Sequence, residues 1–163
     1  MDLSQRLGFT ERSILMIKSD IAHCYANAGR MDEAIIMRRE VYANRALRVG
    51  GSEERHLAAV NLVCSLLKAN LLKEARAVLR ESLPLARGQL GENSRHTLML
   101  LEASAMCVAY DENSTRADLL EAESTLVDVI DRTRRVFGPR HLFMPTREKH
   151  LEQLRGRLRT LDE

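Results

Sequence analysis

The chain has 163 residues, of which 45% are hydrophobic and 29% are charged, and its formal net charge at pH 7 is only +2. This is the composition of one soluble, ordered domain rather than of a disordered or collagen-like chain. So small a net charge provides no global field that would recruit nucleic acid. Leu, Ala, Arg and Glu are abundant and aromatic residues make up 4%, a balance that favours helices over strands.

Membrane and disulfide-rich classes are disfavoured as well. The longest apolar run, residues 57–67, is about half as long as a membrane-spanning helix requires. Charged residues throughout the first 20 positions leave no stretch suited to a signal peptide. Cys24, Cys64 and Cys107 are an odd number without a Cys-x-x-Cys pair, which argues against a disulfide framework or a cysteine zinc site. We expect a cytoplasmic, reducing environment; import into an organelle with a transit peptide since removed is the alternative.

Two independent markers recur along the chain with a common period. The first is a turn-like glycine after an apolar segment, at spacings of 43, 40 and 47 residues: Gly8, Gly51, Gly91 and Gly138. The second is a Glu-Ala pair, at spacings of 41 and 47 residues, which begins at Glu33, Glu74 and Glu121. Both spacings lengthen in the last interval, which matches a polar insertion near residues 111–118. The shared period and insertion indicate an internal repeat.

Each period is predicted to form two helices. The first helices span residues 13–28, 56–69 and 97–110, and the second helices span residues 31–48, 72–90 and 118–137. Apolar side chains at three- and four-residue steps define one face of the earliest helix: Ile14, Ile17, Ile21 and Tyr25. A glycine closes each second helix, as expected where the chain must adopt a left-handed conformation.

Prolines and leucines define the rest of the helical pattern. Pro84 lies inside the 72–90 helix and predicts a kink or an early break there, because proline removes one backbone hydrogen bond. A final helix starts at Pro145 or Thr146 and runs to about residue 161. Its apolar stripe consists of Leu151, Leu154, Leu158 and Leu161.

The motifs around these helices resemble tetratricopeptide repeats of the kinesin light chain type. The matching segments are residues 21–25 (Ile-Ala-His-Cys-Tyr), residues 29–34 (Gly-Arg-Met-Asp-Glu-Ala) and the joint at residues 90–98 (Leu-Gly-Glu-Asn-Ser-Arg-His-Thr-Leu). The next joint, Gly138-Pro139-Arg140-His141, keeps the histidine in register. The chain departs from the family at Ser19, Asp20 and Leu66, and the proline of the joint is absent.

The resemblance implies an all-α fold, a right-handed α-α superhelix of about three helical hairpins plus a C-terminal helix. The resemblance extends from Leu7 to about Leu161. We expect one domain, residues 1–163: an N-terminal joint (1–12), repeat 1 (13–50), repeat 2 (51–90), repeat 3 (91–138) with its insertion, and a terminal helix (139–163). One hairpin cannot bury its apolar face alone, so neighbouring repeats stack around a continuous core. Whether the chain is a fragment of a longer array stays open.

Motifs for catalysis are absent from the sequence. There is no phosphate-binding loop, dinucleotide fingerprint, nucleophile elbow or His-Glu-x-x-His pair. All three cysteines fall on first helices, where a thiol usually packs between helices as a small apolar group. We therefore expect no enzyme, no cofactor and no metal site.

The resemblance implies a concave groove lined by the first helices. Its candidate residues are Ser19, Asp20, His23 and Asn27 from repeat 1, Asn61, Cys64 and Lys68 from repeat 2, and Glu102 and Met106 from repeat 3. Polar side chains at helical spacing can hydrogen-bond an extended peptide, while pockets between helices take its side chains. We expect a non-enzymatic protein–protein interaction module, a scaffold or adaptor that holds a peptide or protein segment.

The C-terminal region carries a separate charge signal. Residues 131–163 hold nine basic and five acidic side chains, whereas residues 1–130 sum to −2. The candidate basic patch comprises Arg132, Arg134, Arg135, Arg140, Arg155, Arg157 and Arg159. Because guanidinium groups pair with oxyanions, the alternative function is binding of nucleic acid or an acidic partner. A structural subunit of a larger assembly is a further alternative, and self-association stays open.

Overall fold

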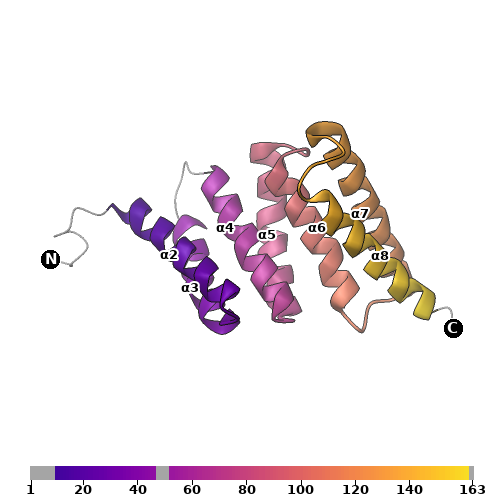
Figure 1. Cartoon of the computed structure of the whole chain (residues 1–163), viewed down its shortest axis with the longest axis horizontal. Coiled ribbons are helices and arrows are strands. Elements are labelled where there is room, and N and C mark those ends of the chain that lie inside the picture. The colour runs from indigo at the N-terminus through magenta and orange to yellow at the C-terminus, as the bar shows by residue number, and fades with distance from the viewer. Residues whose placement is uncertain (1–9, 47–51, 162–163) are drawn as a thin grey trace.

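The computed structural model describes residues 10–46 and 52–161, and these residues form helices joined by short turns, with no strand among them (Figure 1). The helices are α2 (Glu11–Asn27), α3 (Met31–Ala46), α4 (Ser52–Lys68), α5 (Leu72–Leu90), α6 (Arg95–Tyr110), α7 (Arg116–Phe137) and α8 (Met144–Thr160). The all-α prediction is confirmed.

Most predicted boundaries lie within two residues of the observed ones, with three differences. Helix α4 begins at Ser52, four residues before the predicted start, with Glu53 and Glu54 in its first turn, where acidic side chains favour the helix dipole. The predicted insertion at 111–118 is shorter, because α7 already begins at Arg116. Of the two outcomes predicted at Pro84, the early break is wrong, because α5 continues to Leu90, and the kink stays a prediction.

Helix α5 tolerates Pro84 because its packing continues on both sides of the proline. Leu79 and Ala86 are buried in the main core, before and after the proline. The burial of this face outweighs the one backbone hydrogen bond that the proline removes.

The turns inside the first two hairpins have the same backbone hydrogen bonds. Gly29 donates to the Ala26 carbonyl and Asn70, 41 residues later, donates to the Leu67 carbonyl. The neighbouring amides of the two turns also donate to carbonyls at matching positions, so that each hydrogen bond of the second turn lies 41 residues after its counterpart in the first. Gly29 and Asn70 both have positive φ, 76° and 55°, a conformation that glycine and asparagine tolerate best.

The joints after α5 and α7 also match each other. Gly91 and Gly138 have φ of 84° and 91°, and their amides donate to the Arg87 and Arg134 carbonyls at 3.1 Å in both cases. The two glycines are 47 residues apart, the spacing found in the sequence. The predicted glycine ends are confirmed here; Gly8 and Gly51 lie outside the described residues.

The helices stack in chain order from the α2–α3 hairpin at one end to α7 and α8 at the other (Figure 1). Each helix packs on the next, and in addition α4 packs on α6 and α6 on α8. The largest core cluster lies among α3, α4, α5 and α6, and a second cluster joins α6 and α7 to Leu154 and Leu158 of α8. Within the described residues, no helix is both long and apolar enough to cross a membrane.

The predicted apolar face of α2 is only partly covered. Leu15 and Ala22 are the buried residues of this helix, whereas the Ile17 and Ile21 side chains stay 41% and 39% exposed. Helix α2 packs mainly on α3, so among the described residues no further hairpin covers its outer side.

Candidate binding site between α4, α6 and α8

A cavity of about 630 Å³ opens between α4, α6 and α8, and we call it the α4/α6/α8 pocket. Its lining residues are Cys64, Leu67, Lys68 and Asn70 from α4 and the turn after it, Met99, Glu102, Ala103, Met106 and Tyr110 from α6, and Phe143, Thr146 and His150 from α8 and its N-cap. The volume is typical of a small-ligand or side-chain pocket.

Helical periodicity explains how three separate segments line one pocket. The α6 residues recur at three- and four-residue steps from Met99 to Tyr110, so they form one stripe of that helix. On α8, Phe143, Thr146 and His150 follow the same rule. Helix α6 is held at its N-terminus by Ser94, whose hydroxyl accepts from the Thr97 amide at 3.1 Å.

The polar wall of the pocket is centred on Glu102. One carboxylate oxygen accepts from Arg147 Nε at 3.0 Å, and the other lies 2.8 Å from His150 Nδ1. Both partners come from α8, so this carboxylate ties α8 to α6 across the pocket wall. The Glu102 side chain is 13% exposed and that of Arg147 is 1% exposed.

Arg147 is a buried cation with a nearly complete set of partners. Besides Glu102, its Nη1 donates to the Thr133 hydroxyl of α7, and its guanidinium lies 5.6 Å from the Phe143 ring centroid. Its Nη2 has no hydrogen-bond partner among the described residues. Because a buried charge is costly unless paired, Glu102 is needed to keep Arg147 inside the fold.

The pocket also contains a thiol, an imidazole and a carboxylate, the residue types of thiol hydrolases. Burial, with a smaller contribution from the Glu102 charge, raises the pKa of the Cys64 thiol. A nucleophilic cysteine requires the opposite shift, toward the thiolate. The arrangement therefore favours Cys64 as a packed thiol in the pocket wall.

The structure brings four of the nine predicted groove residues together: Cys64, Lys68, Glu102 and Met106 line the same pocket. Ser19 and Asn61 face a separate small crevice. The Ser19 hydroxyl donates to the Leu15 carbonyl, and the backbone carbonyl of Asn61 accepts from Arg38 Nη1. The remaining three are exposed on α2: Asp20, His23 and Asn27.

Sequence reasoning missed the contribution of α8. No residue of the terminal helix was among the predicted groove residues, yet this helix and its N-cap supply Phe143, Thr146 and His150 to the pocket. Their three- and four-residue spacing was the available signal. The pairing of His150 with Glu102, 48 positions earlier, depends on the stacking of helices and leaves no trace in local sequence.

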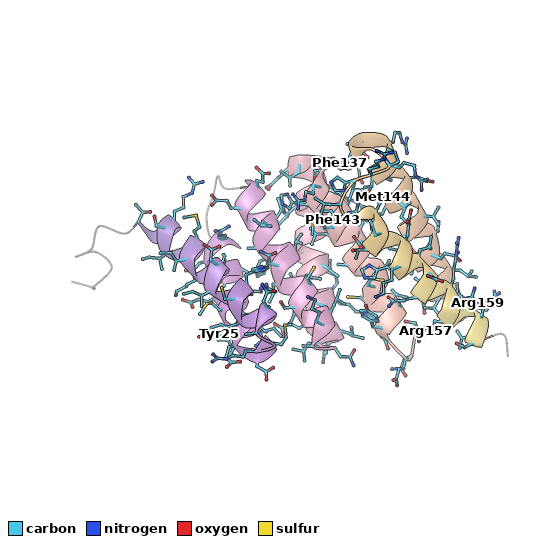
Figure 2. All side chains as sticks on the ribbon, in the orientation of Figure 1. Tyr25, Phe137, Phe143, Met144, Arg157 and Arg159 are labelled. Atoms are coloured by element: carbon cyan, nitrogen blue, oxygen red, sulfur yellow. The ribbon has the colours of Figure 1, made fainter. Side chains whose placement is uncertain are left out.

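The predicted basic patch is largely occupied by internal partners. Arg132 pairs with Asp128 and Glu92, Arg134 with Asp131 and Glu148, and Arg155 with Glu123. Figure 2 shows Arg157 and Arg159 toward the C-terminal end of α8, away from Phe137 and Phe143. Of the seven predicted patch residues, Arg135, Arg140 and Arg159 are exposed and form no ion pair with any described residue.

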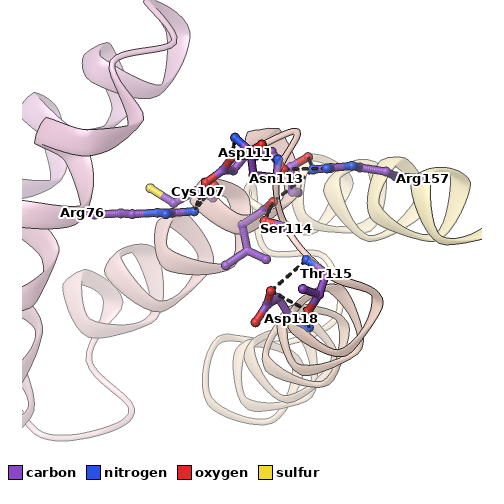
Figure 3. Close-up of polar contacts among 10 residues, drawn as sticks. Arg76, Cys107, Asp111, Asn113, Ser114, Thr115, Asp118 and Arg157 are labelled. Atoms are coloured by element: carbon purple, nitrogen blue, oxygen red, sulfur yellow. Dashed lines mark hydrogen bonds and ion pairs between the residues drawn. The ribbon is translucent and has the colours of Figure 1, made fainter. Parts of the chain in front are cut away.

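Arg157 closes the C-terminal end of α6. Its guanidinium donates to the carbonyls of Val108 and Ala109, at 3.1 and 2.6 Å, and to that of Asp111 (Figure 3). These carbonyls include the groups that a helix end leaves without partners. From the other side of the loop, Arg76 of α5 pairs with the Asp111 carboxylate at 2.7 Å (Figure 3).

Neither a family model, nor a curated protein, nor a solved structure matches this chain. Among the described residues, no group of three or more His, Cys, Asp or Glu side chains is placed to hold a metal ion.

Proposed function

We propose that the chain is a tetratricopeptide-like interaction module, a non-enzymatic scaffold or adaptor that binds a peptide or protein segment along its first helices. The α4/α6/α8 pocket is the single observation that carries this proposal. It joins predicted groove residues from two repeats with side chains of α8, which is the arrangement needed to seat one side chain of a bound peptide.

The repeated backbone geometry supports the tetratricopeptide-like superhelix. The turns at Gly29 and Asn70 share one hydrogen-bond pattern, and the joints at Gly91 and Gly138 share another. Stacked copies of one hairpin present their first helices side by side, and α4, α6 and α8 pack in this way.

The lining chemistry favours a large apolar anchor side chain. Met99, Met106 and Phe143 supply apolar walls, and methionines adapt to differently shaped side chains. Lys68 and Asn70 add hydrogen-bond donors at the same pocket, where they can bind peptide carbonyls. An extended segment with one buried anchor is a common mode of peptide recognition.

The alternative through the C-terminal arginines has less support. Arg132, Arg134 and Arg155 are paired with carboxylates, and Arg157 is bonded to three carbonyls of α6 and its loop. Phosphate binding would require these groups to give up internal partners.

Selection from a random 12-residue peptide display library tests the proposal. We expect enriched peptides to share one large apolar residue, and their affinity to fall about tenfold, near 1.4 kcal/mol, in Thr146→Trp, which fills the pocket. The matched control is Thr160→Trp, the same change on the same helix outside the pocket. Failure to enrich any peptide, or equal binding by both variants, would contradict groove binding.

A further inference from the structure

A second and larger hollow, about 1200 Å³, runs along α5 and uses a different face of α6 from that of the pocket; we call it the α5 groove. Its α6 wall consists of Ser104, Cys107 and Val108, with Asp111 just beyond the helix. Along α5 it extends from Leu72 to Arg87, which corresponds to about 22 Å of helix, or four turns.

The α5 groove combines an apolar floor with a basic rim. Ala77, Leu79, Leu83 and Val108 contribute apolar surface. The cations of the rim all come from α5, on one side of that helix: Lys73, Arg76, Arg80 and Arg87. The lining includes no aromatic residue.

The acidic residues of the groove are already neutralised. Glu74 holds Arg39 of α3 through two bonds of 2.7 and 2.6 Å, and Asp111 holds Arg76 at 2.7 Å. Lys73 and Arg80 are exposed and have no ion pair or hydrogen bond to any described residue. The groove therefore carries two uncompensated positive charges beside its apolar floor.

Pro84 adds an open acceptor at the same place. It lies inside α5 and lines the groove, and because proline has no N–H, the Arg80 carbonyl lacks its usual helical donor. A bound partner can supply a polar side chain to this carbonyl. Arg80 therefore has both a guanidinium without an ion pair and a main-chain carbonyl without its usual helical donor.

We propose that the α5 groove binds an acidic amphipathic helix of a partner protein. An apolar stripe of the helix packs on the floor, and flanking Asp or Glu side chains pair with Lys73 and Arg80. The groove extends over about four turns of α5, which matches a helix of about 15 residues lying along it. Nucleic acid fits less well, since phosphates make no use of an apolar floor and no aromatic ring is present for bases to stack on.

This inference goes beyond the proposed function, because it concerns another surface and another class of ligand. With both sites occupied, the chain would bridge two partners, one extended in the α4/α6/α8 pocket and one helical in the α5 groove. The sites can be tested apart, since Lys73 and Arg80 do not line the pocket and Thr146 does not line the groove.

The test is a display selection with random 20-residue peptides on the wild-type chain, counter-selected on the Lys73→Glu/Arg80→Glu variant. We expect enriched peptides with Asp or Glu beside apolar residues at three- and four-residue steps. Synthetic copies should bind the variant at least about tenfold more weakly by fluorescence anisotropy, and gain helical circular dichroism on binding. Both substituted side chains are exposed and without partners, so the variant should fold as the wild type does.

Two controls accompany this test. Arg135→Glu/Arg140→Glu makes the same charge change at exposed arginines outside the groove and should leave affinity within about twofold. Thr146→Trp should also leave it unchanged, which separates this proposal from the pocket. The proposal would be overturned if no acidic helical peptide were enriched, or if the enriched peptides bound the groove variant as well as the wild type. It would also be overturned if the wild-type chain self-associated or bound single-stranded RNA and the groove variant alone lost that binding.

Discussion

The two ends of the stack differ in the size of the core cluster that each one buries. At the N-terminal end, the α2–α3 hairpin buries a small cluster around Leu15 and Val41, while Met16, Ile17 and Ile36 stay 57%, 41% and 64% exposed. At the other end, α8 covers α6 and α7 with the buried Leu154 and Leu158. We therefore expect similar helical hairpins to differ in stability because of their position in the stack.

The ion pairs at the two ends differ in the same way. Lys18 of α2 and Glu40 of α3 form a pair at the surface, with both side chains substantially exposed. The pair of Arg147 with Glu102 is almost wholly buried. Exposed pairs contribute little because water and salt screen them, whereas removing one partner of a buried pair leaves an uncompensated charge.

The largest expected effect comes from breaking the buried pair. Arg147→Met should lower the free energy of unfolding by about 3–5 kcal/mol, and Lys18→Met at the opposite end by less than about 1 kcal/mol. Urea denaturation followed by circular dichroism measures both. Adding Glu102→Gln to Arg147→Met should recover part of the loss; a cost for Arg147→Met no greater than that for Lys18→Met would break the comparison.

Core truncation should sharpen the same contrast. Leu154→Ala is expected to cost about 3–4 kcal/mol and Leu15→Ala about 2 kcal/mol, because the smaller cluster at the N-terminal end can relax around the lost side chain. Denaturation gives the two values, and hydrogen exchange should show α2 and α3 amides exchanging faster than those of α6. Equal costs with uniform exchange would mean that the stack unfolds as one unit.

Helix caps provide a smaller test at matched sites. The Ser94 hydroxyl accepts from the Thr97 amide at the start of α6, and the Thr10 hydroxyl accepts from the Ser13 amide at the start of α2. Ser94→Ala should lower the free energy of unfolding by about 1 kcal/mol. Thr10→Ala should lower it by only a few tenths of a kcal/mol, because α2 lies at the end of the stack and frays. The reverse order of the two denaturation midpoints would show that the N-terminal hairpin is not the weaker end.

The smallest effect concerns a thiol and appears only in alkali. Burial raises the pKa of Cys107 from the ordinary value of 9.0 to about 11. Its contribution to stability is therefore complete below about pH 9 and is lost as the pH rises toward 11, because the unfolded thiol ionises first. The stability difference between wild type and Cys107→Ala should shrink over that window. At neutral pH, a thiol reagent should modify the exposed Cys24 well before the buried Cys107.

Local sequence predicted the helices well because their signals are local. Apolar steps, the glycines before the joints and the Glu-Ala pairs all act within a few residues, and helix α5 was predicted with its observed ends. Pro84 was the exception, since α5 owes its continuity past the proline to burial against other helices. That burial belongs to the assembled core and cannot be inferred from one helix.

The candidate site was predicted only in part, for the same reason. Cys64, Lys68, Glu102 and Met106 were identified from their positions on the first helices, and they do line one pocket. The pairing of Glu102 with Arg147 and His150, and the use of Arg157 to close α6, join segments more than 40 positions apart.

By itself, the sequence determined the helical class and most helix boundaries, because these follow from residue spacing, glycine conformation and capping. Only the tertiary structure decided which apolar faces are covered, which arginines are free and which are bound internally, and that α8 completes the pocket. Those outcomes depend on which helices meet and how far each charge is removed from water.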